Sequence, residues 1–546
     1  MYITEVLTKT KSGKLSHTCI LLRESYREDG KVKNRTIANL THRDPKDIEA
    51  IKFALKNKSK LSKQKEVKGF IELTQGQSVG SVYFLYQLAK KIGIEKALGS
   101  SLDGKLALWQ VISRIIGSRS ILSSVRLASS YAACDVLNIK ETFNEDTLYD
   151  NLSWLSENQE KIEDKLYKSR ETDLFLYDVT SSYMEGENNV FAEYGYNRDK
   201  KSGKKQIVLG LLTDSEGTPV SIEVFSGSTR DFDTLGSQVQ KAKARFNCKR
   251  VTFVGDRGMI KSPQIESLSS ANFSYITAIT KPQIERLLTD GIFQLELFTE
   301  SLCEIECEGV RYVLRKNHYR EKEIRKTREQ KLNLLKKLVI EGNKYLSEHK
   351  RAKVETQIKL ITQKIDKLKF NTWISLENND IALKLKIDTE KLNEISKLDG
   401  CYVLKTDLSI EVSKETIHKR YKDLYKVEEA FKISKTEFLE MRPWYVCTEK
   451  STRGHALVVM LAYLLVKELK ELWSELNTTI EEGINQLSLI TVIEAKIMGG
   501  GVCNTIPSAG KKTAALLKAA KVELPEVIPN LGTVVVTRKY LADSRK

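Results

Sequence analysis

Two aspartates stand at or near the ends of strongly apolar segments. Asp178 lies in LFLYDVT and Asp256 lies in TFVGDRG. A carboxylate among such neighbours is costly to bury unless it is paired or binds a cation. One such aspartate is most often a turn residue or a helix cap, but two at corresponding strand positions favour a cation site. The pair therefore predicts a metal site between neighbouring strands.

Glu428 is the best candidate for a third oxygen ligand. It lies in the helical segment YKDLYKVEEAFKISKTEFLEMRPWY, where Glu429 must point elsewhere because adjacent helical residues diverge by about 100°. Tyr421 lies seven residues before Glu428 and Lys435 lies seven after it, so the three side chains share one helix face. A helix face that bears a hydroxyl, a carboxylate and an ammonium could bind a phosphodiester. This helix considered alone would favour a salt-bridged surface stripe.

The segments that must position these carboxylates form the pattern of a mixed α/β layer. Three apolar strands come first, and the turn Ser215-Glu216-Gly217-Thr218 joins the second to the third. An amphipathic stretch over residues 233–246, a strand, a short helix and a last strand follow. The expected strands are LFLYDVTSSY, QIVLGLLTD, PVSIEVFSG, RVTFVGDRG and SYITAIT, and GCYVLKTD resumes the sheet later. Beyond it we expect a long helix over residues 417–439 and a buried helix over residues 456–476.

The N-terminal part divides into a small β unit and a helical domain. Residues 19–40 have β-rich runs around the turn Glu28-Asp29-Gly30, which predicts a hairpin. Residues 81–166 show helical periodicity and few prolines. They form either a helix-turn-helix DNA reader or an ordinary helical bundle.

The segment over residues 315–370 is strongly basic. It holds 18 Lys and Arg against 7 Asp and Glu, an excess of 11 positive charges. A heptad seam predicts paired helices, and Glu341-Gly342-Asn343 is the expected break between them. The segment is either a solvated coiled-coil hairpin or an arm that contacts DNA. The seam consists of Val354, Ile358, Ile361, Ile365 and Leu368.

The overall composition favours a polyanionic partner and excludes a membrane-spanning helix. The 89 Lys and Arg exceed the 72 Asp and Glu, which gives a formal charge of +17 and a pI near 9.2. The longest apolar run covers residues 456–466, far short of the roughly 20 needed to span a bilayer. Scattered cysteines without zinc spacing and an N-terminus without an export segment favour the cytoplasm. A chain of 546 residues is expected to form several structural units.

Together these motifs resemble the DDE transposases of bacterial insertion sequences. The resemblance is to the family with the Tyr-x2-Arg-x3-Glu-x6-Lys signature, in the branch with YDVT and GDRG motifs. Tyr421, Glu428 and Lys435 fall at the signature spacings, whereas Leu424 stands where the signature has Arg. Residues 195–231 and 442–455 also resemble the family, and the similarity runs from about Tyr177 to Leu465.

The resemblance implies an α/β, RNase H-like (retroviral-integrase-like) catalytic core with a mixed sheet. It also implies Asp178, Asp256 and Glu428 as a catalytic, metal-binding triad for two Mg²⁺ ions, with Mn²⁺ as an alternative ion. Lys435, Tyr421 and Arg257 would contact DNA phosphates, although Arg257 equally fits a structural partner of Asp256. The implied partners are double-stranded DNA at terminal inverted repeats and target DNA, with a homodimer in the synaptic complex. The implied location is the bacterial cytoplasm, in association with the nucleoid.

Other residues of the RPWYVCTEKSTRGH segment have open roles. Trp444 either packs or stacks on a flipped base. Arg453 and His455 are expected to cap or orient the helix that follows. Besides an active transposase, the sequence permits a catalytically inactive DNA-binding relative that acts as a repressor, or a nuclease that does not join strands.

The expected domain boundaries follow from these assignments. An insertion carrying the basic arm would interrupt the core between Asp256 and Glu428. The expected divisions are a β unit (1–70), a helical domain (71–168), the first core part (169–285), the insertion (286–399), the second core part (400–480) and a C-terminal region (481–546).

Overall fold

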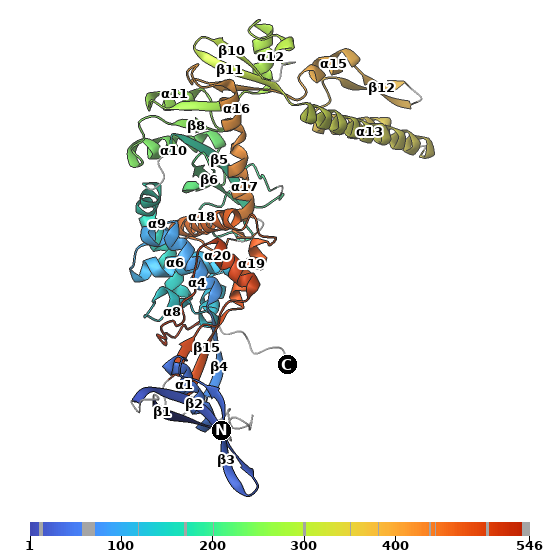
Figure 1. Ribbon diagram of the computed structural model, residues 1–546. Coiled ribbons are helices and arrows are strands. Elements are labelled where there is room, and N and C mark those ends of the chain that lie inside the picture. The colour runs from blue at the N-terminus through green and yellow to red at the C-terminus, as the bar shows by residue number, and fades with distance from the viewer. Residues whose placement is uncertain are drawn as a thin grey trace.

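The architecture comes from a computed structural model (Figure 1). It describes residues 1–9, 15–56, 71–117, 120–168, 172–199, 201–298, 302–349, 351–379, 382–435, 438–442, 444–497 and 502–537.

An eight-stranded mixed sheet forms the centre of the chain, in the order β10-β11-β14-β9-β8-β5-β6-β7. Strand β6 is buried at every residue, so the apolar run QIVLGLLT lies in the middle of the fold. Strands β5, β8 and β9 are parallel, and the remaining pairs are antiparallel. The strands are β5 (Leu174–Tyr183), β6 (Gln206–Thr213), β7 (Pro219–Ser226), β8 (Thr252–Val254), β9 (Ser274–Ala278), β10 (Cys303–Cys307), β11 (Val310–Lys316) and β14 (Cys401–Thr406).

The mixed α/β layer is therefore confirmed, with one addition that the sequence did not predict. The turn between β6 and β7 uses Gly217 at φ +73°, as its position in the hairpin requires. Strands β10 and β11 lie inside the segment expected to be an insertion, yet they extend the central sheet beyond β14. Short strands with ordinary alternation give a weak pattern, and their place depends on a partner strand nearly a hundred residues later.

Helices follow the strands of this sheet on both sides of the insertion. The expected helix over residues 233–246 is α10 (Leu235–Gln240) continued by a π-helical turn over Lys241–Arg245. Next come α11 (Ser262–Ser270) and α12 (Lys281–Thr289). The long helix expected over residues 417–439 is divided at Asp423 into α16 (Lys414–Lys422) and α17 (Leu424–Lys435).

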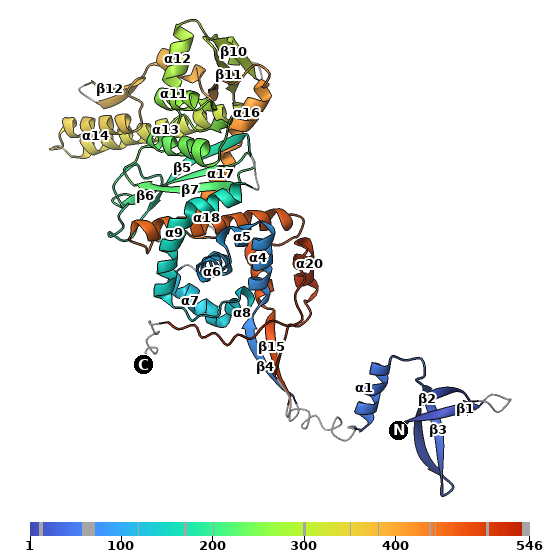
Figure 2. The same cartoon turned by 90° about the vertical axis from the view of Figure 1, so that its left-hand side faces the viewer.

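A helical domain packs against one end of the sheet. In this domain α6 (Leu102–Ile116) lies in the middle, and the other helices of the domain surround it in Figure 2. Helix α18 (Glu449–Leu472) packs on α9 and α6 on one side and on β7 and α17 on the other, which explains its nearly all-round burial. The helices are α4 (Gly80–Lys91), α5 (Ile94–Leu98), α6 (Leu102–Ile116), α7 (Ile121–Ser130), α8 (Ala133–Leu137) and α9 (Glu145–Tyr167).

Helix α18 begins earlier than its apolar run. Thr448 is its N-cap, and the Thr448 hydroxyl accepts a hydrogen bond from the backbone N–H of Ser451. Arg453 and His455 therefore lie inside the helix, so the expectation that they cap a helix after them is wrong. The polar first turn concealed the true start, because sequence periodicity locates the buried face rather than the end of a helix.

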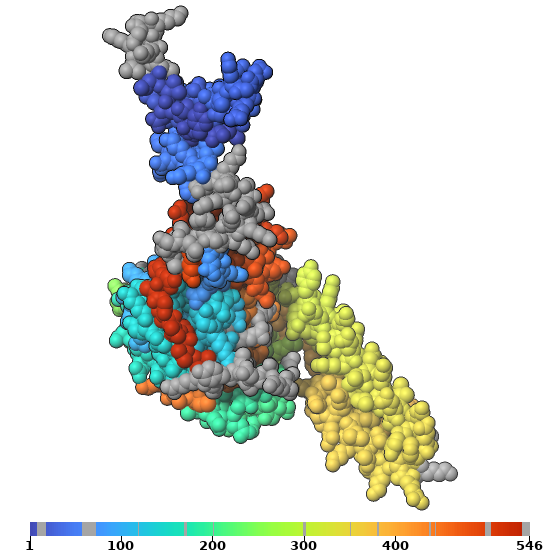
Figure 3. Space-filling model, turned by 90° about the horizontal axis from the view of Figure 1, so that it is seen from below, coloured from blue at the N-terminus to red at the C-terminus, as the bar shows by residue number. Residues whose placement is uncertain are grey.

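The basic segment projects from the sheet as an arm with a core of its own (Figures 1 and 3). The expected break at Gly342 is wrong, because α13 (His318–Glu348) continues through it and the chain reverses before α14 (Val354–Lys367). Glycine lowers helix stability by only about 1 kcal/mol, which packing readily offsets. Strands β12 (Ile374–Asn379) and β13 (Ala382–Ile387) and helix α15 (Thr389–Lys397) complete the arm.

The N-terminal part contains a three-stranded sheet of β1 (Tyr2–Lys9), β2 (Leu15–Glu28) and β3 (Lys31–Asn39), followed by α1 (Pro45–Lys56). Asp29 at φ 49° and Gly30 at φ 76° form the predicted hairpin turn. A second small sheet joins β4 (Ile71–Ser78) to the C-terminal strands. The C-terminal elements are α19 (Ile480–Ser488), β15 (Thr491–Ile497), β16 (Val502–Thr505) and α20 (Lys511–Ala519). No helix in the described part is long and apolar enough to cross a membrane.

Candidate active site

The two aspartates lie at the same level of neighbouring parallel strands. Leu176 of β5 pairs with Val254 of β8. Asp178 and Asp256 each follow two residues later, so the register directs both to the same edge of the sheet. Strand β5 continues past this level whereas β8 ends, which leaves the second aspartate in the loop that follows β8. The sheet thus brings together two carboxylates that are 78 residues apart in the sequence.

Asp178 is the more buried of the two carboxylates. Its Oδ1 atom accepts a hydrogen bond of 2.8 Å from the backbone N–H of Val179. Burial raises the pKa of Asp178 to about 7, and the like charges of Glu428 and Asp256 add to the rise. The Val179 N–H and the guanidinium of Arg198 act in the opposite direction. A positive ion at this position would favour the ionised carboxylate.

Asp256 is exposed and is held by two donors. Its Oδ1 accepts hydrogen bonds from the backbone N–H of Arg257 at 2.7 Å and from the hydroxyl of Tyr421 at 3.2 Å. Burial and the charge of Asp256 raise the pKa of the Tyr421 phenol, so the hydroxyl stays a donor. The exposed guanidinium of Arg257 forms no ion pair with any described residue. Arg257 therefore contacts Asp256 through its backbone alone.

Glu428 reaches the aspartates from α17. A cavity of about 550 Å³ is lined by all three acidic side chains together with Tyr421, Arg257 and Leu424. Leu424 thus lies in the cavity at the position where the signature has Arg. The three carboxylates do not converge as a cage: within the described ranges, no three His, Cys, Asp or Glu side chains are grouped to hold one ion.

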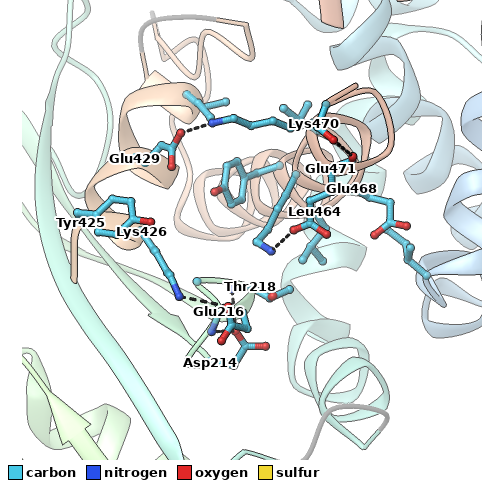
Figure 4. Close-up of a pocket in the computed structure, with 17 residues that line it drawn as sticks. Asp214, Glu216, Thr218, Tyr425, Lys426, Glu429, Leu464, Glu468, Lys470 and Glu471 are labelled. Carbon is cyan, nitrogen blue, oxygen red and sulfur yellow. Dashed lines mark hydrogen bonds and ion pairs between the residues drawn. The ribbon is translucent and has the colours of Figure 1, made fainter. Parts of the chain in front are cut away.

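Glu429 confirms that neighbouring residues of this helix face different ways. It lines a second cavity, of about 790 Å³, between α17, α18 and the β6–β7 turn (Figure 4). There it forms an ion pair with Lys470, and Lys426 of the same helix pairs with Glu216 of the turn at 3.2 Å. Glu428 is therefore the acidic residue of the pair that faces the aspartates.

Lys435 is not among the residues that line the carboxylate cavity. Its Nζ atom donates to Asp199 Oδ1 at 2.9 Å, to Thr180 Oγ1 at 3.1 Å and to the backbone carbonyl of Ser181 at 2.5 Å. Arg442 pairs with the other oxygen of Asp199 at 3.0 Å. Burial lowers the pKa of Lys435, although Asp199 opposes the shift. The ammonium is thus occupied by protein groups rather than directed to a DNA phosphate.

Trp444 and His455 have packing roles. Trp444 is 3% exposed and donates from Nε1 to Ser182 Oγ at 2.9 Å, so its ring has no face available to a base. Burial and the charge of Arg114 lower the pKa of His455 to about 3, which keeps the imidazole neutral. Both residues pack together at the start of α18.

Comparison with known proteins agrees with this arrangement. Residues 169–465, more than half of the chain, match the family described as "Transposase DDE domain". Residues 5–68 match "IS1634 family transposase, N-terminal domain". The chain belongs to the DDE transposases. No curated protein matches the transposase.

A weak structural likeness was also found. It is to the cryo-EM structure of a piggyBac transposase synaptic complex with hairpin DNA, at 9% identity and a TM-score of 0.30. The likeness covers 68% of this transposase and 57% of the other chain.

Several residues near the carboxylates of the transposase were not predicted from the sequence. Arg198 forms an ion pair of 2.6 Å with Asp231 and lowers the pKa of Asp178. Asn317 and Tyr402 line the cavity from segments before and after the arm. No local pattern marks these residues, because their proximity arises only when distant strands pair.

Proposed function

We propose that the transposase cleaves DNA at the terminal inverted repeats of its insertion sequence and joins the freed ends to target DNA. Asp178, Asp256 and Glu428 would be the catalytic carboxylates, in a core of the RNase H-like kind. The single observation that carries the proposal is the shared cavity of these three side chains, which come from β5, the loop after β8 and α17. Membership of the DDE transposase family supports the same assignment.

The donor set fits a hard divalent cation such as Mg²⁺ or Mn²⁺. Mg²⁺ is usually held by one or two carboxylates together with waters and substrate phosphates, so it does not require a three-carboxylate cage. The raised pKa of Asp178 supports this fit, because like charges from Glu428 and Asp256 contribute to it and a cation would remove that repulsion. When bound, two such ions would activate the attacking hydroxyl or water and stabilise the leaving oxygen.

The chain's own residues would position the acidic groups and the DNA. Tyr421 would orient Asp256 through its hydrogen bond, and Lys435 would stabilise β5 through Thr180. Arg257 would contact a phosphate, since its exposed guanidinium lines the cavity. We further propose that a homodimer pairs the two ends of the element, in the bacterial cytoplasm at the nucleoid.

Cleavage of a supercoiled plasmid that carries the element's own ends tests this function. The wild-type transposase should nick and then join the DNA in Mg²⁺ and should only bind it in EDTA. Asp178→Asn should bind the same DNA in a mobility-shift assay without cutting it. Normal cleavage by Asp178→Asn would show that the assigned carboxylate is wrong.

A catalytically inactive, DNA-binding repressor is the second candidate. Leu424 favours it, because an apolar side chain lines the cavity where the signature places Arg. The plasmid assay separates the candidates: a repressor would shift the DNA and leave it uncut in Mg²⁺. A nuclease that does not join strands would give nicked DNA without joined products. The Leu424→Arg variant is a further comparison, since a repressor that lost only this contact should gain activity.

A further inference from the structure

The connection between β5 and β6 exposes two large aromatic side chains. Tyr194 is 67% exposed and Tyr196 is 84% exposed, and Gly195 separates them. Trp444, by contrast, is buried and hydrogen-bonded to Ser182 of β5. Aromatic rings usually bury most of their area, so two neighbouring rings left in solvent indicate a contact surface.

The backbone beneath the two rings is held rigidly. A Cβ atom on Gly195 would lie 2.1 Å from the carbonyl of Gly227 and 2.6 Å from Nε2 of Gln206, so only glycine fits there. The Gln206 amide donates to the carbonyls of Tyr196 at 3.2 Å and Gly227 at 2.8 Å. Glu193 and Gln206 also exchange two backbone hydrogen bonds, of 3.1 and 2.9 Å. The rings are thus presented from a fixed segment, which reduces the ordering that binding would cost.

This segment leads directly to the carboxylate cavity. Arg198 follows Tyr196 by two residues, which span at most about 7 Å. Its backbone N–H donates to Ser181 Oγ on β5 at 2.9 Å, and its guanidinium pairs with Asp231. Asp231 Oδ2 lies 3.5 Å from the position that a Cβ on Gly258 would take, in the loop that carries the second catalytic aspartate. The segment that carries the tyrosines is therefore joined to β5 through Arg198, and Asp231, the ion-pair partner of Arg198, lies near the loop that carries Asp256.

The connection that carries the rings also bears exposed cations, besides the exposed carboxylate of Glu193 next to Tyr194. Lys201 and Lys204 are exposed on the same connection, where Lys204 pairs with Glu185 and Lys201 lies 5.6 Å from the Tyr183 ring centre. Cations that follow exposed aromatic rings on the same connection suit a nucleic-acid strand, because the cations attract phosphates and the rings stack on bases. An apolar protein partner would not require the cations.

We propose that Tyr194 and Tyr196 form a stacking platform for unpaired bases of the DNA strand next to the scissile phosphate. Bases inside a duplex already stack on each other, so the rings can act only where the strand is opened. Opening costs a few kcal/mol, and stacking on aromatic side chains offsets that cost with little sequence preference. The inference rests on the proposed function, because it takes the cavity as the place where DNA is cut.

The test compares two DNA probes in EDTA, where no cleavage occurs. One is a blunt duplex, and the other is the same duplex with a single-stranded extension that carries 2-aminopurine. The wild-type chain should bind the extended probe at least about fivefold more tightly and quench its fluorescence. The double variant Tyr194→Ala/Tyr196→Ala should lose both the preference and the quenching, whereas Tyr194→Phe/Tyr196→Phe should keep them.

Three results would overturn the platform. They are a wild-type chain without a preference for the extended probe, alanine variants that keep the preference, and phenylalanine variants that lose it. Thermal unfolding of each variant checks that the fold is intact. The Glu428→Gln variant separates this inference from the proposed function. It should keep the preference and lose cleavage, so normal cleavage by that variant would refute the function without affecting the platform.

Discussion

Tyr421 donates a hydrogen bond of 3.2 Å to Asp256, and this bond joins α16 to the loop after β8. The two residues are 165 positions apart in the sequence, with the whole basic arm between them. Both residues line the carboxylate cavity. A tyrosine at the start of the signature thus fixes the orientation of the second aspartate, although the sequence suggested a phosphate contact.

Replacing Tyr421 by Phe should therefore slow DNA cleavage without preventing DNA binding. A hydrogen bond to a charged acceptor contributes about 1.5–3 kcal/mol, and solvent around the exposed Asp256 reduces this to a loss of roughly tenfold in rate. Single-turnover cleavage measures the effect. Tyr425→Phe is the matched control: Tyr425 lines the same cavity, but the described residues give its hydroxyl no hydrogen-bond partner, so its rate should not change. Equal rates for both variants would contradict the orienting role.

Lys435→Met should lower stability rather than weaken a phosphate contact. Removing one partner of a buried ion pair costs about 3–5 kcal/mol, and Arg442 still neutralises Asp199, so we expect a loss of about 2–3 kcal/mol. Urea unfolding measures this loss. Each phosphate contact contributes about 0.9 to the slope of log affinity against log salt concentration. Because Lys435 is expected to make no phosphate contact, this slope should stay unchanged in Lys435→Met. Lys422 is an exposed lysine that lines the cavity, so Lys422→Met should make the slope shallower and leave the stability unchanged. A shallower slope with unchanged stability for Lys435→Met would show a phosphate contact.

His455 should make the fold less stable in mild acid. Its pKa is about 3 in the folded chain against 6.5 in the unfolded chain, so below pH 6.5 only the unfolded chain takes up the proton. Stability from this group is complete above pH 6.5 and is lost by about 1.4 kcal/mol per pH unit as the pH falls toward 3. Urea unfolding of the wild type and of His455→Gln at pH 7.5, 6.5 and 5.5 tests this. Parallel pH curves for the two proteins would contradict a buried neutral imidazole.

Gly342→Ala should stabilise the arm. The helix α13 runs through this position, and an added Cβ would make ordinary contacts of 3.4 Å with Gln357 and 3.6 Å with Ile361. Alanine favours a helix over glycine by about 1 kcal/mol. Gly400→Ala should instead destabilise, because its φ is +76° and a Cβ would lie 2.5 Å from the Asn317 carbonyl. Thermal unfolding compares the two, and a destabilised Gly342→Ala would indicate a break in the helix.

That the three carboxylates line one cavity was predictable, because each lies next to a strong local pattern. Asp178 and Asp256 follow apolar runs that are buried strands, and the parallel pairing of those strands gives both residues the same level. Glu428 was indicated by its place on a helix whose other residues, such as Val427, are buried. Patterns of this kind report buried strands and helix faces, although Asp256 and Glu428 are themselves exposed and only Asp178 is largely buried.

The contacts that the other side chains of the site make depend on the tertiary structure, which the sequence pattern does not show. Tyr421 and Lys435 were expected on one helix face, but the division at Asp423 and the approach of β5 send them to different partners. Tyr194 and Tyr196 were not selected, because a sequence pattern does not show which aromatic side chains stay exposed in the fold. Their signal was the close spacing of aromatic, glycine and basic residues in YGYNRDKKSGKK.

The central claim is that Asp178, Asp256 and Glu428 act as one catalytic unit. Residues that act as a unit show strongly non-additive losses, so the most direct measurement is the cleavage rate of the three single variants and of the triple variant. Asp178→Asn, Asp256→Asn and Glu428→Gln should each reduce Mg²⁺-dependent cleavage by at least about 10³, and the triple variant should be little slower. Losses that multiply from variant to variant, or one variant with the wild-type rate, would contradict the account.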